Sequence, residues 1–107
     1  MFRVSINKDA LRLIQESKKI YEIRLKRGFF TKISEGDSIN FINNNLSTVK
    51  IVDNILEFDS IDEMYSYLDY RQCAPLSLNL EEAKQRLYKF YSKSKLKNYN
   101  VIAIKLK

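Results

Sequence analysis

The spacing of apolar residues along the chain predicts both strands and helices. Apolar and polar residues alternate, as in half-buried strands, over residues 2–6, 20–26, 38–41, 48–58 and 99–106. Helical spacing is seen over residues 8–16, 61–68 and 80–91, and a residue able to cap a helix precedes each run: Asn7, Ser60 and Asn79. We expect a turn at 43–45, a bulge or break at 53–54, and irregular or loop structure over 27–36, 70–77 and 92–98.

The order of these elements favours an α+β fold. Strands that follow one another along the chain usually lie side by side, and the predicted helices separate only some of them. We therefore expect a small β-barrel or curled sheet of mostly antiparallel strands, with helices at the rim. The chain has 107 residues, of which 45% are hydrophobic, which is enough for one core and too few for two. Residues 1–107 are thus expected to form a single domain.

The composition narrows the chemistry that is open to the chain. Cys73 is the single cysteine and there is no histidine, which excludes an internal disulfide, zinc sites built on these ligands, and nucleophiles activated by histidine. No apolar run approaches the roughly 20 residues of a membrane span, and the first residues lack the apolar stretch of a secretory signal. We expect a cytoplasmic protein in a reducing compartment, without metal or cofactor, and with Cys73 as an inert residue of a loop.

Positive charge is concentrated at the two ends of the chain. The formal net charge is +6. Residues 1–32 and 81–107 are rich in lysine and arginine, whereas the segment between them has only Lys50 and Arg71 as cations and several carboxylates. If the two ends lie side by side, they form one positive face, and such a face attracts phosphate backbones by releasing counterions.

One charged pattern stands at the entrance of the second predicted strand. Alternation from Ile20 onward sends Glu22 and Arg24 to one face of this strand, with Lys19 close to its start. Two interpretations are open. The pattern is typical of a solvated strand face with a surface ion pair worth ~0–1 kcal/mol, and spacing alone favours this interpretation. The same two cations around one carboxylate also suit the binding of a polar or anionic ligand.

Four segments of the chain resemble the ASCH family, a branch of the PUA-like barrels. Residues 19–24 (KIYEIR) look like its Gly-x-Lys-Thr-x-Glu-x-Arg stretch, and residues 36–41 (GDSINF) look like its Gly-Asp-x-Ile-x-Phe strand. Residues 58–64 (FDSIDEM) are similar to the start of a family helix, and residues 100–104 (NVIAI) to the closing strand. The resemblance covers nearly the whole chain. The sequence departs from it at Ser17 and Ile20, where the family usually has Gly and Thr.

The resemblance implies a barrel with a cleft beside the Lys-Glu-Arg strand, and RNA or a nucleotide as the partner. Some small bacterial members hydrolyse the acetyl amide of acetylated cytidine with a Lys, a Thr and a Glu. Lys19 matches that Lys, but Glu22 stands at the position of the Thr. No carboxylate occurs in residues 71–75, the region of the catalytic Glu, and Asp69 is the nearest upstream. Whether the chain is an enzyme is therefore left open.

Three hypotheses follow from these observations. In the first, the chain is an RNA- or nucleotide-binding module with a ligand cleft formed by Tyr21, Glu22, Arg24 and Tyr99. Its predicted nucleic-acid contacts are Lys18, Lys19, Arg24, Lys26, Arg27, Lys32, Phe29 and Phe30, the two aromatic rings being candidates for base stacking or for the core.

In the second hypothesis, the chain is a small hydrolase that acts on a modified, acylated nucleoside or on RNA. Lys19 would then be the base or electrostatic catalyst, and Glu22 would orient it or activate water. In the third, the acidic middle segment binds a protein partner, although its charges are also typical of a solvated helix face.

Overall fold

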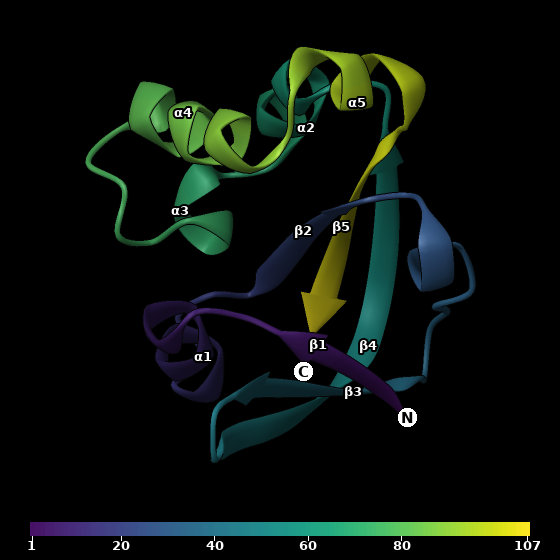
Figure 1. Cartoon of the computed structure of the whole chain (residues 1–107). Helices are drawn as coiled ribbons and strands as arrows, with labels where there is room; N and C mark the ends of the chain where they lie inside the picture. Colours follow the sequence, from purple (N-terminus) through teal and green to yellow (C-terminus); the bar gives the residue numbers. More distant parts are fainter.

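The chain folds into five strands, five α-helices and one short 3-10 helix (Figure 1). A computed structural model describes all residues from 1 to 107. The strands are β1 (Phe2–Ser5), β2 (Tyr21–Leu25), β3 (Ser38–Asn43), β4 (Leu46–Phe58) and β5 (Val101–Leu106). The helices are α1 (Lys8–Gln15), η1 (Gly28–Thr31), α2 (Ile61–Tyr67), α3 (Tyr70–Cys73), α4 (Leu80–Phe90) and α5 (Lys93–Asn98). None of them combines the length and the apolar character that a membrane crossing needs.

The five strands form one curled sheet in the order β1-β3-β4-β5-β2. Every neighbouring pair is antiparallel except β1 and β3, which run parallel. The prediction of a mostly antiparallel, curled α+β sheet is therefore confirmed. The long strand β4 pairs with β3 through its first part and with β5 through its second, and its register shifts between Val52 and Asn54. This predicted bulge bends the sheet, which leaves β1 and β2 as the two free edges of a half-barrel (Figure 1).

Two hydrophobic clusters lie on opposite faces of β5. Val101 and Ala103 pack in the cluster that contains β2 and helices α2 to α4. Ile102, Ile104 and Leu106 pack in the cluster that contains β1, α1 and β3. Successive side chains of a strand point to opposite faces, so β5 is buried on both sides and holds the two layers of the domain together. The grouping of Ile102, Ile104 and Leu106 was predicted from the alternation.

The predicted helix starts are confirmed, but the three segments predicted as irregular or loop structure contain helices: residues 28–31 form the 3-10 helix η1, and the other two segments contain α-helices. The side chains of Asn7, Ser60 and Asn79 each accept a hydrogen bond from the backbone N–H three residues later, which is the geometry of an N-cap. Residues 70–73 and 93–98, in contrast, form α3 and α5. Each of these helices is too short to show an apolar period. Leu96 is the residue of α5 that packs against the core.

Ser17 ends α1 in a left-handed backbone conformation, with φ of 59°. The backbone N–H groups of Lys18 and Lys19 both donate to the carbonyl of Leu13, at 2.8 and 3.0 Å, as in the turn that commonly closes a helix. Glycine adopts this conformation without steric cost, which accounts for the glycine that the resembled family has at this position. The turn reverses the chain and sets the backbone of Lys19 just ahead of β2.

We predict that Ser17→Gly stabilises the protein by about 0.5–1 kcal/mol, because glycine removes the steric cost of the positive φ while adding some entropy to the unfolded chain. Urea unfolding gives the free energy of unfolding for this comparison. The control is Ser17→Ala, which keeps the strained conformation and loses the 3.3 Å hydrogen bond that the Ser17 hydroxyl accepts from Lys50. Equal stability of the Gly and Ala variants would contradict the backbone explanation.

Candidate functional site

A cleft of about 610 Å³ opens between the two free edges of the half-barrel. Residues at the end of β1 and the start of α1 form one side, β2 lies at the bottom, and α3, the segment that follows it, and α4 form the other side. The lining residues are Ser5, Ile6, Asn7, Lys8, Asp9, Ala10, Leu13, Lys19, Glu22, Ile23, Arg24, Tyr65, Cys73, Ala74, Pro75, Leu76, Ala83, Arg86, Leu87, Phe90 and Tyr91. The cleft thus brings residues of the basic N-terminal segment together with residues of α4.

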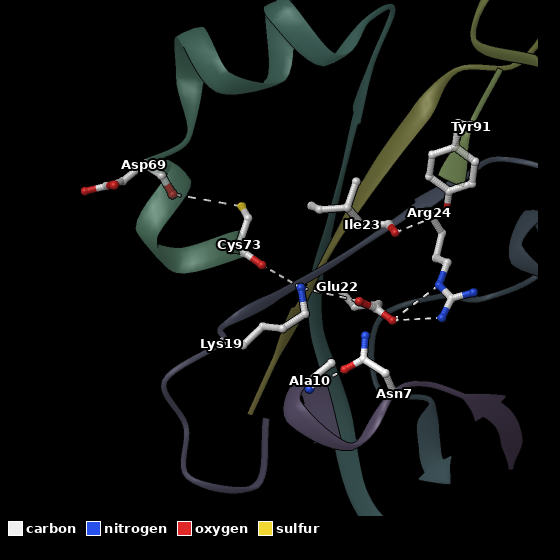
Figure 2. A network of polar contacts seen from close by, with 9 residues as sticks. All are labelled: Asn7, Ala10, Lys19, Glu22, Ile23, Arg24, Asp69, Cys73 and Tyr91. Carbon is white, nitrogen blue, oxygen red and sulfur yellow. Dashed lines mark hydrogen bonds and ion pairs between the residues drawn. The ribbon is translucent and has the colours of Figure 1, made fainter. Parts of the chain in front are cut away.

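Lys19, Glu22 and Arg24 form a charged floor in this cleft (Figure 2). The Lys19 ammonium lies 3.4 Å from Oε1 of Glu22, and Nη2 and Nε of Arg24 donate to Oε2 at 3.0 and 3.3 Å. The side chains are 11%, 9% and 25% exposed, respectively. Spacing alone favoured a solvated surface pair, and this interpretation is wrong, because the carboxylate is buried between the two cations.

The charged floor is held from two further directions. The Lys19 ammonium donates to the backbone carbonyl of Cys73 at 2.6 Å, and the backbone N–H of Ile20 donates to the carbonyl of Gln72 at 2.8 Å, so β2 is tied to α3. Behind Arg24, the ring of Phe30 lies 5.3 Å from the guanidinium carbon, a cation–π distance. Phe30 thus packs against Arg24. It is not among the residues that line the cleft.

The charged floor keeps hydrogen-bond donors that no protein group uses. The hydrogen bonds to Glu22 occupy two of the five N–H donors of Arg24. The Lys19 ammonium uses one of its three donors on the carbonyl of Cys73 and forms an ion pair with Glu22. With two cations and one carboxylate, its formal charge is +1. Spare donors and a positive charge in a partly enclosed space suit a ligand that carries oxygen acceptors or negative charge.

Cys73 and Tyr91 border the charged floor as neutral groups. Burial raises the pKa of the Cys73 thiol to about 11, although the Lys19 ammonium opposes this shift. Burial also raises the pKa of Tyr91, and the charge of Arg24 works against it. The Tyr91 hydroxyl donates to the carbonyl of Ile23 at 3.5 Å. Cys73 was predicted to lie in a loop, but it ends α3 and its thiol is buried.

The two sides of the cleft differ in character. On the side of α1, Asn7, Lys8 and Asp9 present polar and charged groups. On the side of α4 lies an apolar wall, which we define as Leu76, Ala83, Leu87 and Phe90. None of these residues was predicted for the site from the sequence. The only signal was the helical spacing of positions 83, 87 and 90, which also predicts an ordinary core-facing stripe.

Several residues predicted for the site lie elsewhere. Tyr21 is buried in the core and Tyr99 lies beside Arg27, whose guanidinium carbon is 5.8 Å from the Tyr99 ring centre. Lys26 pairs with Glu57 at 2.7 Å. Phe29 stacks between Phe2 and Phe30. The predicted residues that do not line the cleft are Tyr21, Lys18, Lys26, Arg27, Lys32, Phe29, Phe30 and Tyr99.

We predict that Glu22→Ala lowers the free energy of unfolding by about 3–5 kcal/mol, because it breaks a buried ion pair and leaves two partly buried cations without their carboxylate. Urea unfolding measures the effect. Arg12→Ala is the matched control, since the Arg12–Asp9 pair is 3.7 Å long and both side chains are well exposed, so its loss should cost ~0–1 kcal/mol. Similar losses in the two variants would show that Glu22 acts as a surface charge.

We also predict that Cys73 makes stability fall with pH between about 9 and 11. The native state keeps the thiol proton up to a pKa of about 11, whereas the unfolded chain loses it near a pKa of about 8.5, so deprotonation in this range favours unfolding. Urea unfolding at several pH values should show a steeper decline for the wild type than for Cys73→Ala. Parallel pH profiles would contradict the prediction.

Comparison with known proteins places the fold. No protein-family model and no curated protein matches the chain. It is similar to the crystal structure of hypothetical protein PH0355, with a TM-score of 0.89, 26% identity and coverage of 99% of this chain and 96% of the other. The solution structure of protein PF0455 from Pyrococcus furiosus gives a TM-score of 0.81 and 29% identity, and the match covers 99% of this chain and 94% of the other. The crystal structure of ASCH from Zymomonas mobilis gives a TM-score of 0.71 and 14% identity, and the match covers 98% of this chain and 65% of the other. The chain therefore has the fold of the ASCH structure, as the resemblance implied.

Proposed function

We propose that this chain binds RNA, with a nucleotide seated in the cleft between the edges of the half-barrel. The observation that carries the proposal is the convergence of Lys19, Glu22 and Arg24 on a cleft of about 610 Å³, where they leave donors free. The ASCH and PUA-like fold is generally associated with RNA binding. The single cysteine supports a cytoplasmic place of action, where RNA is present.

The electrostatics of the cleft mouth support an anionic ligand. Lys8 and Arg86 lie on opposite sides of the cleft, on α1 and α4. Lys8 is exposed and makes no ion pair, while Arg86 is partly neutralised by Glu82 at 3.2 Å. Cations on both sides of an opening focus the positive potential there and attract phosphates. These two residues are therefore proposed as backbone contacts, together with the donors of the charged floor.

The basic residues outside the cleft are proposed only as secondary contacts. Lys26 is held by Glu57, which also accepts a hydrogen bond from Asn100 at 2.7 Å. Lys18 lies 3.8 Å from Glu16. Lys32 and Arg27 are exposed and make no ion pair. RNA that extends beyond the cleft could still reach these side chains, but their charges do not converge with the charged floor.

The alternative of a small hydrolase has weaker support in the geometry. Both oxygens of Glu22 are engaged by cations, and Lys19 is held by its ion pair with Glu22 and its hydrogen bond to the carbonyl of Cys73. Asp69 is the nearest carboxylate upstream of residues 71–75. It caps α3 and pairs with Arg71 at 2.8 Å, and it does not line the cleft. A nucleophile needs an adjacent free base, and the charged floor offers none in this arrangement.

We predict that Lys8→Gln weakens RNA binding more than Lys32→Gln does. Both lysines are exposed and without ion pairs, but only Lys8 lines the cleft, so the two variants remove the same charge inside and outside the cleft. Fluorescence anisotropy with a labelled single-stranded RNA, measured over a range of salt concentrations, gives the affinity and the slope of log K against log salt. Lys8→Gln should reduce the slope by about one, and Lys32→Gln should leave it nearly unchanged.

Two other results would contradict the proposal. A wild-type affinity that does not change with salt would mean that phosphates are not bound. A larger effect of Lys32→Gln than of Lys8→Gln would place the RNA on the outer basic residues and away from the cleft.

A further inference from the structure

We infer that the cleft takes one unpaired nucleotide of single-stranded RNA and holds its base against the apolar wall, with Phe90 as the stacking residue. This inference rests on the proposed function and goes beyond it, because it assigns the conformation of the RNA and a residue that recognises the base. Three features of the cleft carry it: the apolar wall, the free edge of β2, and the separation of apolar from charged groups.

The apolar wall is a continuous face of α4. Ala83, Leu87 and Phe90 stand at helical spacing and all line the cleft, so they lie in one row along the helix. Ala83 is fully buried, Leu87 is half-buried and Phe90 is 70% exposed. The row therefore rises from the bottom of the cleft to its mouth. The ring of Phe90, as the most exposed member of the row, stands at the opening.

Two large apolar side chains are exposed at the mouth of the cleft and do not belong to the core. Leu76 is 51% exposed and lines the same side as Phe90. Neither residue is part of the hydrophobic clusters of the core. Large apolar side chains grouped at the rim of a cleft are typical of ligand-binding grooves. The flat face of an aromatic ring is also the surface on which nucleobases stack without regard to sequence.

The edge of β2 adds hydrogen-bonding groups at the bottom of the cleft. The backbone bonds between Leu106 and Ile20 and between Lys26 and Asn100 show that even-numbered residues of this segment pair with β5. The N–H and C=O of Ile23 therefore point away from β5, toward the open edge. Ile23 lines the cleft, and the only contact to its carbonyl is the 3.5 Å bond from Tyr91.

These groups match the parts of a nucleotide. A base has flat apolar faces for the apolar wall and an edge of donors and acceptors for the backbone of Ile23. Its phosphate carries the charge that suits Lys8 on the opposite side and the spare donors of Arg24. Within a duplex, both faces of an internal base are covered by neighbouring base pairs, so such a nucleotide must be unpaired to place its base on Phe90. The arrangement thus favours single-stranded RNA over double-stranded RNA.

The test uses the full chain and an RNA octamer with a single 2-aminopurine, whose fluorescence drops when the base stacks on an aromatic ring. The octamer is compared with the same strand annealed to its complement, and affinities come from anisotropy. We expect quenching by the wild type and a clear preference for the single strand. Phe90→Ala should lose the quenching and about 5- to 100-fold in affinity, whereas Phe90→Tyr should retain both.

Tyr67→Ala is the matched control, because Tyr67 is an aromatic residue 71% exposed outside the cleft. Its binding should equal that of the wild type. The inference is overturned if duplex RNA binds as well as the single strand, or if Phe90→Ala and Tyr67→Ala bind alike. If these results appear while Lys8→Gln still weakens binding, only this inference fails. If the wild type binds no RNA, the proposed function fails with it.

Discussion

The structure depends most on the burial of one carboxylate. A charge removed from water is tolerated only when it is paired and hydrogen-bonded, and Glu22 meets this condition through Lys19 on one oxygen and Arg24 on the other. Lys19 also donates to the carbonyl of Cys73, and this second contact of the same ammonium ties α3 to β2. The ion pairs therefore set the shape of the cleft bottom and leave it with a positive charge and spare donors.

The cleft itself exists because the sheet does not close. β4 pairs with β3 and then, past the bulge beside Val52, with β5, so the sheet curls while β1 and β2 remain free edges. Free strand edges expose unpaired backbone groups, and here helices α1, α3 and α4 surround the gap (Figure 1). The surrounding helices leave the opening accessible and give it two different sides, one charged and one apolar.

Only part of the positive charge at the chain ends reaches this opening. Lys8, Lys19, Arg24 and Arg86 line it, while the two lysines at the end of the chain do not. Lys105 and Lys107 approach Asp53 at 3.9 and 3.4 Å and lie outside the cleft. The net charge of +6 is thus a weak guide to the ligand surface, since the tertiary structure decides which cations stay free and which meet carboxylates.

The sequence by itself determined the features that depend on neighbours along the chain. Side-chain caps at helix starts, the alternation in β5 and the common face of Glu22 and Arg24 follow from local geometry, and the family resemblance supplied the overall fold. The sequence could not show that Glu22 is buried, that Phe30 packs against Arg24, or that Phe90 stands at the mouth of the cleft. These facts depend on which surfaces meet across the gap between β1 and β2. Spacing along a strand or helix tells which residues share a face, but packing between distant elements decides what that face touches.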